Sequence, residues 1–320
     1  MRARAVLGAA LFALGCAAKP HPVQPQYQPV ASVLEVVATL RRHLPDDTYR
    51  FEAGRDFTGR NIYRASLIRL ESIERVHADS LRAGNLDDVI AYAKARALER
   101  LRAYDLAAES HRVAAERDGP LRGEARKAAS LDDGLAEAIQ IGYEPDRPLR
   151  SGVRPIPAPS DPNGAIAEYD RRLALLDALG DEANDTFLEP VVKEEVERCD
   201  MARARYFVAR RKLDPDGNVR ALAELQRVVA RHRESKNANR HLLDLADLYA
   251  AMAEEYVQAR PPESLFFDPP AFQELVDSAS QLYEAVANQD GTPEKLEAAR
   301  RLEAFLAFTL RVDRDRFSPQ

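Results

Sequence analysis

The sequence predicts an all-α protein built from antiparallel helix pairs, and three observations lead to this class. Ala, Leu, Arg and Glu dominate the chain, and all four are strong helix formers. Apolar residues recur with the 3.6-residue period of a helix. No convincing run of alternating β-branched residues indicates a strand. Hydrophobic residues make up 45% of the 320 residues, which is enough to form a core.

The first fifteen residues have the organisation of a secretory signal peptide. Arg2 and Arg4 form a basic start, and an apolar run of ten residues follows from Ala5 to Leu14. Ten apolar residues are too few to cross a bilayer core of roughly 30 Å as a helix. No other run approaches the roughly eighteen apolar residues of a spanning helix, so no further membrane anchor is predicted.

The apolar run ends in Ala13-Leu14-Gly15-Cys16, which resembles the lipobox of bacterial lipoproteins. The resemblance implies that residues 1–15 are removed and that Cys16 becomes a lipid-carrying N-terminus. Ala13 and Leu14 depart from the usual Leu and small residue, and a plain signal peptide cut at an Ala-x-Ala site is the alternative. In that family an Asp after the cysteine retains the protein at the inner membrane. Ala17 therefore favours the periplasmic face of the outer membrane.

Residues 16–30 are rich in proline and are predicted to form an extended tether that holds the body away from the lipid. The body itself is acidic, because the formal net charge of the chain is −6 and both signs are interspersed. A nucleic-acid-binding protein needs a basic face, so this class is excluded.

The chain contains two cysteines, Cys16 and Cys199. If Cys16 carries lipid, Cys199 has no partner within the chain and no disulfide framework is predicted. Cys199 lies among Val196, Ala202 and Tyr206, so we expect it to be a small core residue.

Two helical domains are predicted, joined by a proline-rich linker at 142–163 in which six prolines leave no apolar period. The N-terminal domain covers 31–141, with helices at 32–44, 62–81, 86–101, 104–117 and 123–141. The C-terminal domain covers 164–320, with helices at 165–179, 190–213, 219–231, 239–258, 271–287 and from 293 onward. Gly180 is expected to end the first helix of the C-terminal domain, and Thr292 to cap the last.

Residues 48–61 contain Gly54 and Gly59 at the glycine spacing of a phosphate-binding P-loop. Arg60 stands where that loop needs the phosphate-binding lysine, and Asn61 where it needs the hydroxyl that binds magnesium. A loop that ends with Asn61 as a helix N-cap is therefore the favoured interpretation.

The helix predicted at 62–81 contains Glu74-x-x-His77, half of a di-iron carboxylate motif. A di-iron site needs a second such pair and two more glutamates, and the chain has no second ExxH. A solvated helix face is the simpler explanation of Glu74 and His77.

The helices at 86–101 and 104–117 resemble a tetratricopeptide repeat. Ala95, Leu98, Tyr104, Ala107 and Ala114 fall at the small, large, aromatic and two alanine positions of that family. Small Ala95 and Ala107 allow two antiparallel helices to approach closely. The family's two aromatics, leucine and glycine are replaced here by Ala91, His111, Lys94 and Arg102.

A sharper resemblance begins at Ser235-Lys-Asn-Ala238 and continues through Leu245, Ala246 and Tyr249. It is similar to the S-x-x-A…L-[GA]-x-x-Y signature of tetratricopeptide arrays in envelope proteins, including the lipoprotein of the outer-membrane β-barrel assembly machinery. The family's usual Pro and a small residue are replaced by Arg233 and His241. The resemblance covers about a third of the chain and implies an α-solenoid of stacked helix pairs, in two halves joined by the proline-rich strap.

By the layout of that family, the concave face of such an array binds a peptide or protein. Its groove positions map to Val89, Tyr92, Arg96 and Glu99 in the first half and to Arg240, Leu243 and Asp247 in the second. The alternative is that these positions are ordinary solvated helix faces. If they form a groove, exchanging Arg96 and Arg240 for Glu is predicted to abolish partner capture.

A loop between Pro262 and Pro269 carries Leu265, Phe266 and Phe267. We expect this loop to fold back and fill a space between two helices, because soluble proteins avoid exposed apolar patches. The alternative is a contact with a membrane or a partner.

The chain is therefore expected to be a lipid-anchored scaffold or adaptor of the cell envelope and not an enzyme. A cell-wall enzyme with an unrecognised site and a purely structural spacer are the alternatives. The sequence has no HExxH or GxSxG motif, and His232 and His241 flank a helix junction without a recognised metal spacing. No catalytic residue, metal or cofactor is predicted.

Overall fold

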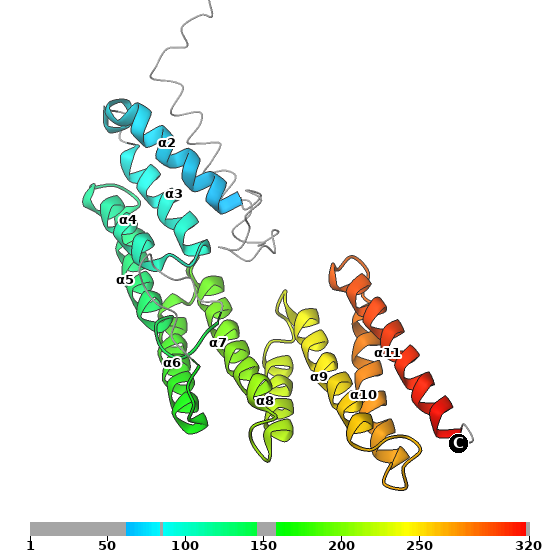
Figure 1. Ribbon diagram of the computed structural model, residues 1–320. Coiled ribbons are helices and arrows are strands. Elements are labelled where there is room, and N and C mark those ends of the chain that lie inside the picture. The colour runs from blue at the N-terminus through cyan, green and yellow to red at the C-terminus, as the bar shows by residue number, and fades with distance from the viewer. Residues whose placement is uncertain (1–61, 84–85, 146–157, 318–320) are drawn as a thin grey trace, which may run out of the picture. The chain divides into compact units, whose positions relative to one another are not determined.

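A computed structural model describes residues 62–83, 86–145 and 158–317 of the chain (Figure 1). In these residues the structure is all-helical and contains no strand, which confirms the predicted class. The lipobox with Cys16, the proline-rich tether, the helix predicted at 32–44 and the loop at 48–61 lie outside the described residues. In the described part, no helix is long and apolar enough to span a membrane.

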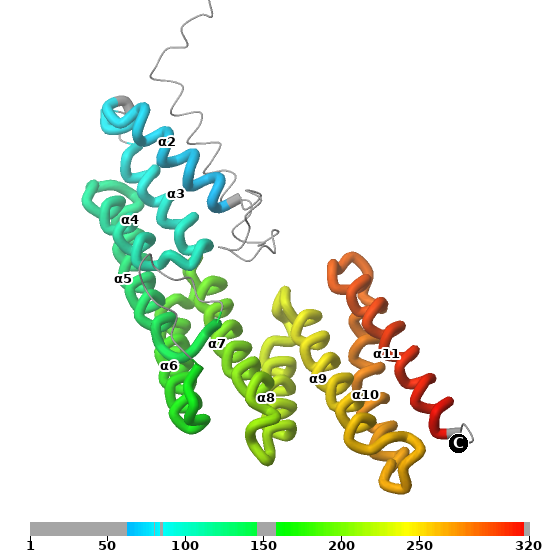
Figure 2. The backbone as a smooth tube through the Cα atoms, in the orientation of Figure 1, coloured from blue at the N-terminus to red at the C-terminus, as the bar shows by residue number. Residues whose placement is uncertain are grey.

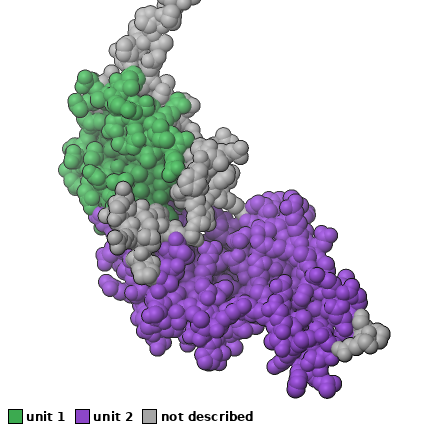
Figure 3. All heavy atoms as spheres, viewed as in Figure 1, with its two compact units in different colours: residues 1–130 green, residues 131–320 purple. Residues whose placement is uncertain are grey.

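The chain divides into two compact units, residues 1–130 and 131–320 (Figure 3). The division falls within helix α5, Arg122–Ala138, upstream of the proline-rich linker predicted at 142–163.

Unit 1 contains α2 (Ile62–Ala83), α3 (Asp87–Arg100), α4 (Tyr104–Glu116) and the start of α5. Consecutive helices α2, α3 and α4 pack against one another. The apolar faces of α2 and α3 form one core cluster that includes Leu70, Ile73 and Ile90. Ala95 and Ala107 are both fully buried, as expected of small residues where α3 and α4 pack together.

The described residues of unit 2 form the end of α5 and six further helices. Each of these six helices except the last packs on the next along the chain (Figure 1). These helices are α6 (Pro162–Ala183), α7 (Glu189–Arg210), α8 (Gly217–Arg231), α9 (Ala238–Ala259), α10 (Pro269–Ala287) and α11 (Glu294–Phe317). Figure 2 traces each helix of the series from α7 to α11 into a turn that leads to the next. One core cluster lies between α7, α8 and α9, and another between α9, α10 and α11.

Local sequence signals explain where several helices of unit 2 begin. Asp161 caps α6, because its carboxylate accepts hydrogen bonds from the backbone N–H groups of Asn163 and Gly164 at 3.0 and 2.8 Å. Proline occupies the first turn of α6, α7 and α10, where its missing N–H group costs no helical hydrogen bond. Helix α6 therefore starts at Pro162, inside the segment predicted to be the linker.

The prediction that Gly180 ends a helix is wrong. Helix α6 continues through Gly180 to Ala183 and ends at Asn184. Leu179 and Ala183 are both buried, and this packing carries the helix one turn past the glycine. The left-handed residue of this connection is Asp185, with φ 59°.

Cys199 is a core residue, as predicted. Its side chain is fully buried in α7, and its thiol is free. The thiol lies 3.8 Å from the backbone oxygen of Tyr169. Burial raises the pKa of the Cys199 thiol to about 12.

Candidate partner-binding groove

Helices α7, α8 and α9 border an open groove of about 430 Å³, which we call the α7–α9 groove. Apolar side chains form much of its lining, and three arginines and two aspartates add charge. The lining residues are Met201, Arg205, Val208, Ala209, Arg211, Leu225, Arg240, Asp244, Asp247, Leu248 and Ala251. A groove with an apolar surface and a few charged groups has the composition expected of a binding site.

Two arginines from different helices share one aspartate in this groove. Asp244 on α9 lies 3.3 Å from Arg240 Nε and 3.8 Å from Arg205 Nη2 of α7. The Asp244 side chain is 17% exposed, whereas those of Arg205 and Arg240 are 45% and 43% exposed. Burial raises the pKa of Asp244, although both arginines act in the opposite direction. Arg240 Nη1 also donates to both carboxylate oxygens of Glu297 on α11 at 3.2 Å, so the two guanidinium groups are half-exposed at the groove and their charges are already partly balanced.

The third arginine, Arg211, has a largely satisfied guanidinium group. It donates to both carboxylate oxygens of Glu255, each at 2.6 Å. These hydrogen bonds, with help from Lys212, lower the pKa of Glu255 to about 2. Arg211 therefore joins the end of α7 to α9 and is a structural residue first.

Asp247 also forms a hydrogen bond and an ion pair with neighbouring helices. It accepts a hydrogen bond from the Tyr283 hydroxyl at 2.7 Å and pairs with Arg301 of α11. Its side chain remains 41% exposed, so it adds negative charge to the groove while holding α9 to α10 and α11.

The three residues predicted as groove positions in the second half, Arg240, Leu243 and Asp247, do not all reach the groove. Arg240 and Asp247 line the α7–α9 groove. Leu243 is fully buried in the core cluster of α9, α10 and α11, so its side chain offers no surface to a partner. The next residue along α9, Asp244, lines the groove instead.

The four residues predicted in the other half all lie on α3 of unit 1. Val89 packs, partly buried, against the core cluster of α2 and α3, and Arg96 contacts both Tyr92 and Glu99. The Tyr92 hydroxyl donates to Glu124 at 2.5 Å, and Arg96 donates to that hydroxyl at 3.4 Å. Arg96 Nε also lies 3.3 Å from Glu99, whose side chain is fully buried. Glu99 faces His111 at 3.6 Å, and burial lowers the pKa of His111 to about 4. This network holds α3, α4 and α5 together, and Glu99 is not available to a partner.

Sequence reasoning missed the contribution of α7 to the groove. Met201, Arg205, Val208 and Ala209 line it from α7. Their spacing of three and four residues is the signal that could have found them, because residues so spaced share one face of a helix. The pattern does not tell which neighbouring helix that face meets.

Two histidines close to the groove each contact a carboxylate of α7. His241 Nε2 lies 2.6 Å from Glu197, and His232 Nε2 lies 2.8 Å from Asp200. Ser235 donates to the same oxygen of Glu197 at 2.6 Å. The Ser235-Lys-Asn-Ala238 turn is thus fastened to α7, which explains what these residues do in the fold.

Glu74 and the 265–267 loop were also singled out by the sequence. Glu74 on α2 accepts a hydrogen bond from Lys94 of α3 at 2.7 Å, so an ion pair between the two helices explains the acidic residue at this position. In the loop, Phe267 packs on Tyr256 and Phe272, as expected for a segment that folds back. Leu265 and Phe266 do not, because they are 102% and 82% exposed. The prediction is right for one residue of the three.

The sequence matches no protein-family model, and it matches no curated protein.

Proposed function

We propose that this chain is a lipid-anchored adaptor of the bacterial cell envelope that holds an extended segment of a partner protein in the α7–α9 groove. The observation that carries the proposal is the groove itself, with its apolar lining and the half-exposed Arg205 and Arg240. Apolar side chains of a partner would pack on Val208, Ala209 and Ala251, which remain partly or fully exposed, whereas Met201, Leu225 and Leu248 are buried in the core beneath them. Its carboxylates or carbonyl oxygens would accept hydrogen bonds from the two arginines.

In the same proposal, the helices form a tetratricopeptide-like solenoid. The packing of each helix from α6 to α10 on the next is consistent with it. So is the position of the resemblance: Leu245 and Ala246 of the signature are buried on α9. Helical arrays of this kind present elongated concave surfaces, which suit a peptide better than a compact ligand.

The location in the envelope rests on the leader sequence and Cys16. Cleavage before Cys16 and its acylation would place the body at the periplasmic face of the outer membrane, behind a proline-rich tether. A palmitate label on the wild-type protein, lost in Cys16→Ser, is the expected result. Sensitivity of processing to globomycin is a second readout. A processed but unacylated N-terminus would contradict this part of the proposal.

The binding part is tested by affinity capture from solubilised envelopes, followed by identification of the co-eluting proteins. Arg240→Glu is expected to remove the specific partner, because it places a negative charge where the partner's oxygens would bind. Arg260→Glu is the matched control: this exposed arginine follows α9 and lies outside the groove.

Loss of the partner in Arg240→Glu, with retention in Arg260→Glu and unchanged circular dichroism, supports the groove. If both variants retain the partner equally, the α7–α9 groove is not the binding site, and a purely structural spacer is the better explanation of the chain. A cell-wall enzyme remains the rival from another class. It predicts hydrolysis or transfer on purified cell-wall material, and such an activity that survives Arg240→Glu would overturn the adaptor.

A further inference from the structure

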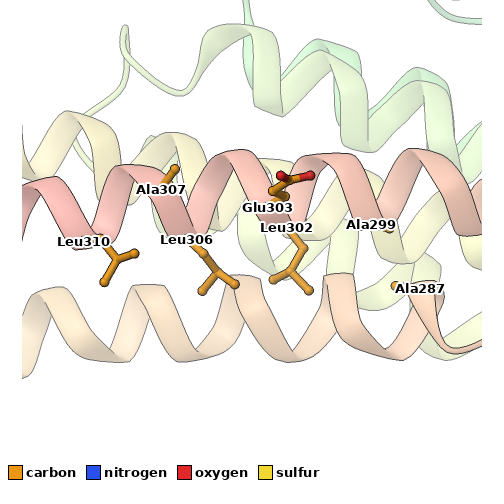
Figure 4. Close-up of a pocket in the computed structure, with 7 residues that line it drawn as sticks. All are labelled: Ala287, Ala299, Leu302, Glu303, Leu306, Ala307 and Leu310. Carbon is orange, nitrogen blue, oxygen red and sulfur yellow. The ribbon is translucent and has the colours of Figure 1, made fainter.

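An apolar stripe runs along the side of α11 that faces α10. Ala299, Leu302, Leu306 and Leu310 follow one another at intervals of three or four residues, which places them on one helix face. They line a groove of about 430 Å³ that Ala287 of α10 closes on one side. Figure 4 shows the three leucines projecting from the same side of α11.

Most of this stripe is exposed to solvent, and only Leu302 packs, partly buried, against the core of α9, α10 and α11. Leu306 is 41% exposed and Leu310 is 69% exposed, whereas Phe305 and Val312 of the same helix are buried in the core. Two large aliphatic side chains so exposed on one face are typical of an interaction surface. Glu303 is the one charged residue of this groove lining.

Opposite charges stand at the two ends of the stripe. Lys295 precedes it and Asp313 follows it, eighteen residues apart along α11. Eighteen residues are five turns of 3.6, so both side chains leave the helix in the same direction. The ammonium group of Lys295 contacts Asp290 at 2.5 Å and has further N–H donors for a second carboxylate. Asp313 is exposed.

We propose that this stripe pairs with the same stripe of a second copy of the chain, with the two α11 helices antiparallel. A two-fold axis beside residue 304 sets Leu302 against Leu306 of the second copy and Ala299 against its Leu310. It also sets Lys295 against Asp313 of the second copy, twice by symmetry. The interface is isologous, so it closes at a dimer.

The two end charges favour a second copy of the chain as the partner and the antiparallel orientation of its α11. A parallel pair in register would place Lys295 against Lys295 and Asp313 against Asp313, which repel. An antiparallel second copy pairs both charged ends and the leucines with a single surface, while Glu303, exposed in the lining beside the axis, lies near the Glu303 of the second copy. The stripe from Ala299 to Leu310 is about 17 Å long, or about 27 Å with the flanking charges, and one helix wide. That is small beside the roughly 800 Å² per partner of a stable interface, so we expect a weak dimer that dissociates on dilution.

Sedimentation velocity of the purified full chain over a dilution series measures the association. A concentration-dependent shift from dimer to monomer is expected for the wild type. Leu310→Glu should abolish the dimer at every concentration reached. Leu265→Glu is the matched control, since it makes the same exchange at a still more exposed leucine outside the stripe. A wild-type monomer throughout, or a dimer broken by Leu265→Glu and not by Leu310→Glu, overturns the proposal.

A charge exchange tests the direction of pairing without depending on one variant. Lys295→Asp and Asp313→Lys should each weaken the dimer about tenfold, because each puts like charges together at both ends. The double variant should restore it. The exchange also favours the helix, since it puts an acid near the N-terminus of α11 and a base near its C-terminus. If the double variant is as weak as the single ones, the antiparallel pairing is wrong.

Discussion

His241 on the first turn of α9 lies 2.6 Å from Glu197 in the middle of α7, forty-four residues earlier in the chain. Glu197 accepts hydrogen bonds from Ser235 and Asn237 at the same oxygen. One buried carboxylate therefore fastens the turn between α8 and α9 to α7 and fixes the spacing of the two helices that carry Arg205 and Arg240.

Removing this carboxylate should destabilise unit 2. Glu197→Ala leaves the donors of Ser235, Asn237 and His241 without their shared acceptor, and we expect a loss of about 3 kcal/mol in the free energy of unfolding. Urea unfolding followed by far-UV circular dichroism measures it. Glu263→Ala, at an exposed loop position, should stay within about 0.5 kcal/mol. Equal stability of the two variants would show that Glu197 contributes little.

Acid should weaken the same connection. Burial by itself raises the pKa of Glu197 and of Asp200, but hydrogen bonds from His241 and Ser235 to Glu197, and from His232 and Arg227 to Asp200, lower both below the ordinary values of 4.5 and 3.8. A depressed carboxyl pKa adds stability that is fully present above the unfolded-state pKa and is lost as the pH falls through the folded-state pKa. Stability should therefore decline below about pH 4 to 5.

A pH series of urea unfolding curves for the wild type and Glu197→Gln checks this dependence. The variant lacks one of the two titrating groups, so its stability should fall less steeply over the acid range. Parallel curves for the two proteins would be evidence against a stabilising role for ionised Glu197.

Two glycines of unit 2 should respond in opposite directions to alanine. Gly180 lies inside α6, and a Cβ there would meet only Val192, at 3.9 Å. Gly180→Ala should stabilise the protein by about 0.5–1 kcal/mol through helix propensity. At Gly217 a Cβ would lie 2.0 Å from the backbone oxygen of Arg211, so Gly217→Ala should cost about 1–3 kcal/mol. Melting temperatures decide both, and a loss of stability in Gly180→Ala would contradict the first.

The thiol of Cys199 should be unreactive in the folded protein. It is fully buried, and its pKa is raised to about 12, so almost no thiolate exists at pH 8. Iodoacetamide should label Cys199 only after urea unfolding, as mass spectrometry of the peptide that contains it would show. Rapid labelling without denaturant would mean that α7 opens readily.

The helical class and the places of most helices follow from the sequence alone, because they depend on local properties. Asp161 before Pro162 is a local signal of a helix start, although the predicted helix begins at 165 and the predicted linker includes both residues. The apolar period of α9 needs no knowledge of its neighbours. Cys199 was recognised as a core residue in the same way. Gly180 shows the limit: packing beyond it, at Ala183, outweighs the local preference of glycine for a helix end.

The candidate site depended on tertiary structure. Periodicity tells which residues share a helix face, but which part of that face meets another helix is decided by packing across long stretches of chain. Leu243 and Asp244 are neighbours on α9, and the first is buried in the core while the second lines the groove. Glu99 looks like a surface residue in the sequence and is buried against His111 in the fold. The sequence by itself determined that helices form and where most of them begin, and packing decided which of their charged residues remain accessible to a partner.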